Sequence, residues 1–239
     1  MNNETKLINF LKEQNIIKNG HFLLTSGLHS DTYIQKDDIL IPPFVRNTVI
    51  DAIVQEVIKY ISINSYNKPT FFEDYVIIGP ATAGSSFAAL VAHQVELPFV
   101  YCEKENLHVR VKADPLTEDV TEDWKTTEKS RKMVFRPNFA KYLKDKKVII
   151  IEDIITTGGS VEKTINAINH CGGEVRKVIC IWNRGDYEPY FNRKYEDGND
   201  YGEFGYNIEF SSLISKRVIS YTEENCPMCK ENIELTTLK

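Results

Sequence analysis

Apolar residues recur at helical spacing in four segments of the chain. Those at 7–17 predict an N-terminal amphipathic helix, which Gly20 would end. Those at 45–58 predict the clearest helix, because they repeat along one face. Two shorter helices are expected at 85–95 and 161–170, each directly after a loop that contains glycine.

Short apolar runs, rich in β-branched residues, separate these helices. Residues 22–34 predict a hairpin with its turn at Ser26 and Gly27. A last strand and helix are expected near 208–215. Strands that alternate with helices indicate a parallel α/β sheet, in which ligands bind at the carboxyl ends of the strands. The remaining strands are expected at 75–78, 99–102, 148–151 and 178–182.

Two segments lack this periodicity. Residues 103–137 are charged and are expected to form one long loop, and loops of this length often act as functional lids. Residues 185–205 are polar and aromatic, and we interpret them as an insertion.

The most informative stretch is Ile149–Ser160, with the sequence IIIEDIITTGGS. An apolar strand ends there in two acids, Glu152 and Asp153, and small residues follow. These small residues can bring backbone N–H groups close to an anion, and Ser160 is a suitable N-cap for the next helix. Carboxylates accept hydrogen bonds from a diol. The stretch therefore favours a ligand with both a phosphate and sugar hydroxyls over a plain turn with solvated acids.

A second loop, GPATAG at 79–84, has the glycine spacing of a P-loop. A P-loop needs Lys and then Ser or Thr after the second glycine, but Ser85 and Ser86 stand there. The chain also lacks the GxGxxG fingerprint of a Rossmann dinucleotide site.

These motifs resemble those of the type I phosphoribosyltransferases, and of their orotate branch in particular. IIIEDIITTGGS resembles the loop that binds phosphoribosyl pyrophosphate (PRPP), and IIGPATAG resembles the pyrophosphate loop. HFLLTSGLHSDTYI (21–34) resembles the orotate hood motif, and PFVYCEKE (98–105) resembles the strand before the mobile catalytic loop. Asn183 and Arg184 fall where this branch carries an arginine that grips the orotate carboxylate.

The resemblance implies a parallel-sheet α/β fold of the type I phosphoribosyltransferases over residues 1–220. It places an N-terminal hood at 1–40 and a mobile loop at 103–137, and leaves a C-terminal tail at 221–239. The implied activity is Mg²⁺-dependent transfer of phosphoribose from PRPP to a nitrogenous base. Orotate or a related pyrimidine is the implied base, and a nucleoside monophosphate and pyrophosphate are the products. A homodimer is also implied.

The same resemblance assigns roles to single residues. Glu152 and Asp153 would hold the ribose hydroxyls and, directly or indirectly, Mg²⁺. Lys104 would stabilise the charge that develops when pyrophosphate leaves. Ser26, Tyr33 and Arg184 would line the base. The 5′-phosphate would bind Thr156, Thr157, Gly158, Gly159 and Ser160, and the pyrophosphate would face backbone groups of Thr82, Ala83 and Gly84.

Four cations of the family pattern are altered here. Thr25 and Ala83 stand at two lysine positions, Glu103 stands at an arginine position, and Leu107 falls near a lysine of the mobile loop. Each charge-assisted contact is worth roughly 1.5–3 kcal/mol, so the losses matter. Six other residues could replace these cations, or could simply be solvated charges of the loop: His108, Arg110, Lys112, Arg131, Lys132 and Arg136.

Composition narrows the setting. The 239 residues are 42% hydrophobic and 26% charged, which fits one large domain with a substantial core. The net charge of −5 offers no basic footprint for nucleic acid. We see no signal peptide and no apolar run near the roughly 20 residues of a membrane span, so a cytoplasmic protein without a membrane partner is expected.

The five cysteines fit a reducing compartment better than a disulfide framework. Cys226 and Cys229 form a CxxC pair, and a structural zinc site would need two more ligands. No second CxxC exists, so zinc would have to recruit a distant histidine, such as His21 or His29, or a second subunit. An unmetallated or redox-labile tail is therefore favoured over Zn²⁺.

Three functions are compatible with the sequence. The first is the phosphoribosyltransferase described above. The second is a regulatory protein that binds PRPP or a nucleotide without turnover, which the altered cations would permit. The third is an interaction module that keeps only the fold, and the intact acid pair argues against it.

Overall fold

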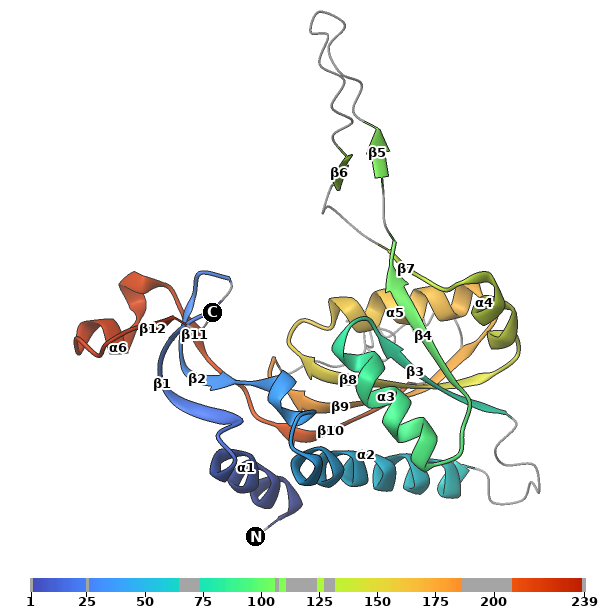
Figure 1. Cartoon of the computed structure of the whole chain (residues 1–239), viewed down its shortest axis with the longest axis horizontal. Helices are drawn as coiled ribbons and strands as arrows, with labels where there is room; N and C mark the ends of the chain where they lie inside the picture. Colours follow the sequence, from blue (N-terminus) through green and yellow to red (C-terminus); the bar gives the residue numbers. More distant parts are fainter. Residues whose placement is uncertain are drawn as a thin grey trace, which may run out of the picture.

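The computed structural model describes residues 2–24, 26–64, 74–105, 108–110, 124–126, 132–185 and 208–237. They form a six-stranded sheet covered by helices and a smaller four-stranded sheet, which holds strands from near both ends of the chain (Figure 1). Among them, no helix is both long enough and apolar enough to cross a membrane.

The larger sheet has the strand order β10-β9-β8-β3-β4-β7. Its first five strands pair in parallel, and β7 runs antiparallel to β4. This arrangement confirms the predicted parallel α/β sheet. The strands are β3 (Tyr75–Pro80), β4 (Phe99–Lys104), β7 (Met133–Val134), β8 (Lys147–Ile155), β9 (Glu174–Asn183) and β10 (Glu209–Ser215).

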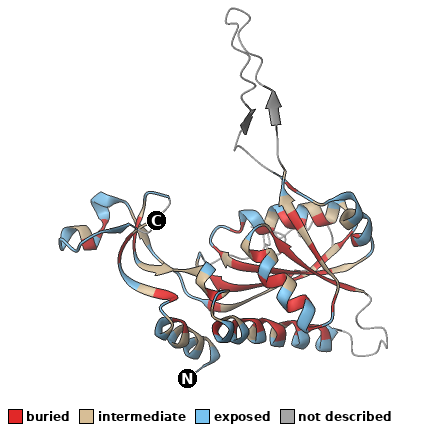
Figure 2. Ribbon diagram, in the orientation of Figure 1, coloured by how far each residue is buried: buried red, intermediate tan, exposed pale blue. Residues whose placement is uncertain are grey.

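Helices cover both faces of this sheet, and its central strands β3, β8 and β9 are buried at most of their positions (Figure 2). One face carries α2 (Pro43–Asn64) and α3 (Ala83–Gln94), and the other carries α4 (Pro137–Leu143) and α5 (Gly159–His170) (Figure 1).

The central strand β8 is covered on both faces, which explains its continuous apolar run at 148–151. Ile149 and Ile151 join the core under α2 and α3, whereas Val148 and Ile150 join the core under α5. Successive side chains of a strand point to opposite faces, so a strand covered on both sides is apolar at every position. β8 thus holds its carboxyl end rigidly between β3 and β9.

The smaller sheet, here called the hood sheet, has the order β11-β2-β1-β12. β1 and β2 form the predicted antiparallel hairpin. β12 pairs in parallel with β1, and β11 pairs antiparallel with β2, so the C-terminal tail is part of the hood sheet. The strands are β1 (Ile17–Leu23), β2 (His29–Ile34), β11 (Ser220–Tyr221) and β12 (Thr236–Thr237), and the short helices nearby are η1 (Lys36–Ile39), η3 (Glu223–Asn225) and α6 (Pro227–Lys230).

The N-terminal helix α1 (Asn3–Glu13) ends earlier than predicted. Asn15 has a φ of 58°, a left-handed conformation that stops the helix, and the chain enters β1 at Ile17. Gly20 therefore lies inside a strand. Leu11 is buried in the core next to α2, so the N-terminal helix belongs to the main body as well as to the hood.

Three other expectations need correction or limits. The helix predicted near 208–215 is wrong, because Glu209–Ser215 pairs along its length with β9. Residues 103–137 are not one structureless loop, since β5 (His108–Arg110) pairs with β6 (Trp124–Thr126), and β7 pairs with β4. The insertion at 185–205 lies outside the described residues beyond Gly185.

Candidate active site

The predicted acid pair lies inside β8, just before the strand ends. Glu152 is 7% exposed and Asp153 is 3% exposed. The Asp153 N–H donates to Glu152 Oε1 (3.1 Å), and the Ile154 N–H donates to Asp153 Oδ1 (2.6 Å). Glu152 Oε2 is buried and has no hydrogen-bond partner in the described part of the chain. Because an unsatisfied buried oxygen is costly, this atom is a candidate ligand for a hydroxyl or a cation.

The pKa values of the two carboxyl groups are shifted in opposite directions. Burial, together with the side chain and charge of the neighbouring Asp153, raises the pKa of Glu152 to about 9, although the hydrogen bond from the Asp153 N–H acts to lower it. Burial would also raise the pKa of Asp153, but hydrogen bonds with Glu152, Lys36 and the Ile154 N–H outweigh it and hold that pKa below its ordinary value. The pair therefore carries one negative charge near neutral pH, and Asp153 bears it.

A lysine from the hood completes this pair. Lys36 begins η1, directly after β2, and its Nζ lies 2.6 Å from Asp153 Oδ2. Burial would lower the pKa of Lys36, but the hydrogen bond and charge of Asp153 raise it above its ordinary value. Lys36 was not predicted as a site residue. Its only signal was a cation directly after the hood hairpin.

The glycine loop between β3 and α3 lies against the acid pair. A Cβ at Gly79 would sit 2.4 Å from Ser85 Cα, so the strand and the helix approach too closely for any side chain. A Cβ at Gly84 would sit 3.0 Å from Glu152 Oε1 and 3.1 Å from the Ile151 carbonyl oxygen. The backbone at Gly84 therefore borders Glu152.

The loop after β8 leads into α5. Thr156 and Thr157 are exposed, and Gly158 is the N-cap with a φ of 76°, a left-handed conformation that glycine adopts without strain. The prediction that Ser160 is the N-cap is therefore wrong, because Ser160 lies in the first turn of α5. No side chain caps the helix, so its first N–H groups are available to an anion.

The end of β9 reaches the same loop. The Arg184 N–H donates to the Ile155 carbonyl oxygen (2.8 Å). A Cβ at Gly185 would sit 2.0 Å from the Thr156 carbonyl oxygen, so the two backbones touch. Arg184 is half-buried, and burial lowers the pKa of its guanidinium. Arg184 thus stands beside the loop 156–160.

The cations predicted from the mobile loop are less well placed. Lys104 is exposed at the end of β4, next to β7. Arg136 donates to Glu103 (2.8 Å), so this proposed replacement is neutralised by the residue that stands at the family's arginine position. Lys132 lines a groove beside α5. The predictions for Thr25, Leu107, His108, Arg110, Lys112 and Arg131 concern side chains outside the described part of the structure.

Two predicted base contacts belong to the hood hairpin. Ser26 is exposed in the turn between β1 and β2. Tyr33 lies in β2, with its ring centroid 5.6 Å from that of Phe22. Their contact with a base stays a prediction.

Comparison with known proteins agrees with this geometry. A family model of the phosphoribosyl transferase domain matches residues 48–196. The orotate phosphoribosyltransferase of Thermoanaerobacter sp. is 31% identical over 233 residues, which cover 96% of this chain and 94% of the relative. That of Caldanaerobacter subterraneus subsp. tengcongensis is 29% identical with the same coverage.

Solved structures show the same fold. The orotate phosphoribosyltransferase from Aeropyrum pernix has a TM-score of 0.52 at 18% identity, covering 87% of this chain and 93% of that one. The adenine phosphoribosyltransferase from Leishmania donovani has a TM-score of 0.51 at 16% identity, covering 90% and 82%. At such identities the likeness concerns the fold alone, whereas the family match and the more similar relatives also bear on the family and its activity. They show that this chain belongs to the phosphoribosyltransferase family and is a phosphoribosyltransferase.

Proposed function

We propose that this enzyme transfers phosphoribose from PRPP to orotate or a related pyrimidine, with Mg²⁺, and releases pyrophosphate. One observation carries the proposal: the acid pair, the glycine loop and the uncapped start of α5 meet at one edge of the sheet. The relatives with 29% and 31% identity, both orotate phosphoribosyltransferases, support orotate as the base.

The same edge offers a separate contact for each part of PRPP. Thr156–Ser160 would receive the 5′-phosphate at the start of α5, where the helix dipole favours an anion. The carboxylate of Asp153 would accept hydrogen bonds from the ribose diol, next to Glu152. Backbone groups of 82–84 would face the pyrophosphate, because their loop borders the acid pair.

The acid pair also fits a magnesium ion. Mg²⁺ prefers oxygen ligands and commonly binds one or two carboxylates together with substrate phosphates. The buried, unpartnered Glu152 Oε2 and the charged Asp153 supply such oxygens, directly or through water. When bound, the ion would neutralise the pyrophosphate as it leaves.

Lys36 would offset part of the altered cation pattern. It is held by the hood beside the diol-binding carboxylate, and its side chain is 42% exposed, so it can also reach a ligand. Lys104 would stabilise charge on the departing pyrophosphate once residues near 103–137 cover the substrate. Water exclusion matters here, because departure of pyrophosphate leaves an oxocarbenium-like sugar that water would attack.

The base would lie between the end of β9 and the hood. Arg184, next to the loop 156–160, would pair with the orotate carboxylate, and Ser26 and Tyr33 would approach from the hood hairpin. We also propose that residues 1–220 are the catalytic domain and that the enzyme is a homodimer, which light scattering on the full chain would test.

The decisive experiment is phosphorus NMR of the protein with Mg²⁺, PRPP and one base at a time. Orotate should release pyrophosphate, whereas uracil and adenine should not. Asp153→Asn should abolish the release, while Asp145→Asn, at an exposed turn, should leave it unchanged. Release with adenine alone would overturn the assignment of the base, and full activity of Asp153→Asn would overturn the site.

A further inference from the structure

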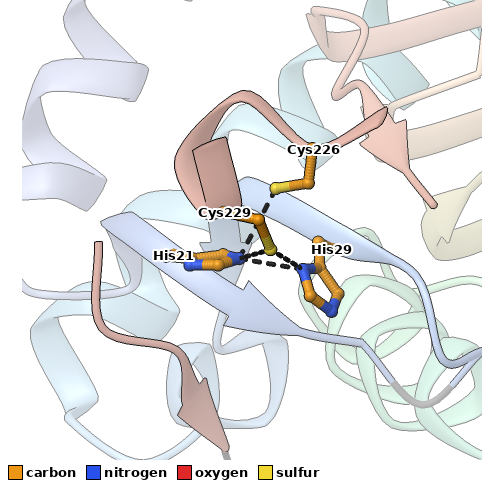
Figure 3. Close-up of side chains that lie close together, drawn as sticks. All are labelled: His21, His29, Cys226 and Cys229. Atoms are coloured by element: carbon orange, nitrogen blue, oxygen red, sulfur yellow. Dashed lines mark hydrogen bonds between the residues drawn. The ribbon is translucent and has the colours of Figure 1, made fainter. Parts of the chain in front are cut away.

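Four metal-binding side chains converge in the hood, away from the acid pair. His21 comes from β1 and His29 begins β2, whereas Cys226 is the N-cap of α6 and Cys229 lies within its single turn (Figure 3). Their ligand atoms, one from each residue, all lie within 4.8 Å of one another. The two histidines are separated from the two cysteines by about two hundred positions in the sequence, as the separation of 205 between His21 and Cys226 shows.

The spacing of these atoms is close to that of a tetrahedral zinc site. Zn–S bonds of about 2.3 Å and Zn–N bonds of about 2.0–2.1 Å place neighbouring ligand atoms roughly 3.3–3.8 Å apart. His21 Nε2 lies 3.5 Å from Cys226 Sγ and 3.6 Å from Cys229 Sγ. His29 Nδ1 lies 3.2 Å from Cys229 Sγ and 2.9 Å from His21 Nε2. These four separations lie within about 0.5 Å of the tetrahedral values, and the other two pairs of ligand atoms lie within 4.8 Å.

The hydrogen bonding of His21 orients it as a ligand. Its Nδ1 lies 2.8 Å from the Ile233 carbonyl oxygen, which can only accept. Nδ1 therefore carries the proton, and the lone pair of Nε2 points to the two sulfur atoms. Metal-bound histidines commonly donate their second ring nitrogen to a carbonyl in this way. Thus the tail that supplies Cys226 and Cys229 also fixes His21.

The tail needs such a cross-link, because it has little core of its own. Between 216 and 237, the only buried residues are Cys226 and Met228. β11 and β12 are two residues long each, and α6 is a four-residue helix. Small modules with too little apolar burial are commonly held by a metal or by disulfides.

We propose that His21, His29, Cys226 and Cys229 bind one structural Zn²⁺ that fastens the C-terminal tail to the hood hairpin. Two thiolates and two imidazoles in tetrahedral reach select zinc among the common divalent ions. All four positions come from the protein, which is the pattern of a structural rather than a catalytic site. The proposal is independent of the base and of catalysis.

The test measures bound metal on the full chain, purified with a thiol reductant and then freed of loose metal. One zinc per chain is expected in the wild type. Cys226→Ser and Cys229→Ser should lose it, whereas Cys171→Ser, a partly buried thiol at the end of α5, should keep it. A wild type that neither holds zinc nor takes it up when supplied would overturn the site, as would variants that keep one zinc.

A second measurement does not depend on the variants folding. Cobalt(II) added to metal-free wild-type protein should give the visible spectrum of a tetrahedral site with thiolate charge-transfer bands, and one equivalent of zinc should abolish it. An octahedral spectrum without thiolate bands, or an exposed Cys226–Cys229 disulfide under the same reducing conditions, would contradict the proposal.

Discussion

At the scale of single residues, the charge on Asp153 depends on the hood. Lys36 is the cation within hydrogen-bond distance of this carboxylate, at 2.6 Å. Removing it should weaken the binding of the ribose, because Asp153 would lose one of the partners that hold its pKa low and would lose its neighbouring cation. Lys36→Met should therefore lower kcat/KM for PRPP by on the order of 10-fold, a value discounted for the partial exposure of the lysine.

Steady-state kinetics at several PRPP concentrations would measure this effect. Lys59→Met, which removes an exposed lysine of α2, is the matched control and should behave as the wild type. Unchanged kcat/KM in Lys36→Met, with folding intact, would show that the ion pair has no part in substrate binding.

Glu152 makes a separate prediction about stability. Its pKa of about 9 in the folded protein lies above its ordinary value, so the folded state holds a proton that the unfolded chain releases. This contribution to stability is complete at low pH and is lost as the pH rises toward 9. Glu152→Gln cannot ionise, so its free energy of unfolding should rise relative to the wild type by up to about 1.4 kcal/mol per pH unit.

Denaturant unfolding at about pH 5 and about pH 8 would measure the difference between the two proteins. Glu13→Gln, at an exposed position of α1, should show no such trend. A difference that stays constant with pH would mean that Glu152 is ionised in the folded protein.

At the scale of elements, Gly84 joins α3 to the acid pair. A Cβ there would meet Glu152 Oε1 at 3.0 Å and the Ile151 carbonyl oxygen at 3.1 Å, so the start of α3 and Glu152 must move apart by a few tenths of an ångström. Gly84→Ala should leave the fold intact but reduce PRPP affinity. Gly79→Ala should instead destabilise the protein by on the order of 1–3 kcal/mol, because its Cβ would lie 2.4 Å from backbone.

Titration calorimetry with PRPP and thermal unfolding would separate the two effects. Wild-type affinity in a folded Gly84→Ala variant would place the pyrophosphate elsewhere.

The elements also show how far sequence reasoning reaches. β8 was predictable because a strand covered on both faces is apolar throughout, and the small residues after the acids indicated a ligand loop. The end of α1 was not predictable, because an asparagine in a left-handed turn has no strong signature in the sequence. β11 and β12 are too short to show any periodicity, and their pairing depends on the three-dimensional course of the chain.

The same limit applies to the candidate sites. The acids lie near the carboxyl end of β8, and the glycine loop and Arg184 come at the ends of β3 and β9, so their meeting at one edge could be foreseen. Lys36 reaches Asp153, 117 positions away, only through the folding of the hood over the sheet. The two histidines and the two cysteines were each noticed, but a histidine 205 positions from a cysteine carries no spacing rule.

At the scale of the whole molecule, the hood joins the two ends of the chain to the acid pair. The tail holds β1 and β2 through β12, β11 and the proposed zinc, and β2 leads directly to Lys36. Removal of zinc should therefore increase local unfolding of the tail and the hairpin. The parallel sheet should stay folded, because local unfolding follows local contacts.

Hydrogen exchange followed by mass spectrometry would test this division. Chelation, or Cys229→Ser, should speed amide exchange in 216–237 and in β1, but not in β3 or β8, whereas Cys171→Ser should change neither region. KM for PRPP should rise under the same treatment, since Lys36 would be held less firmly beside Asp153. Faster exchange across the whole sheet would mean that the hood and the body unfold as one unit. Unchanged exchange in the tail would mean that its short strands, and not zinc, hold it in place.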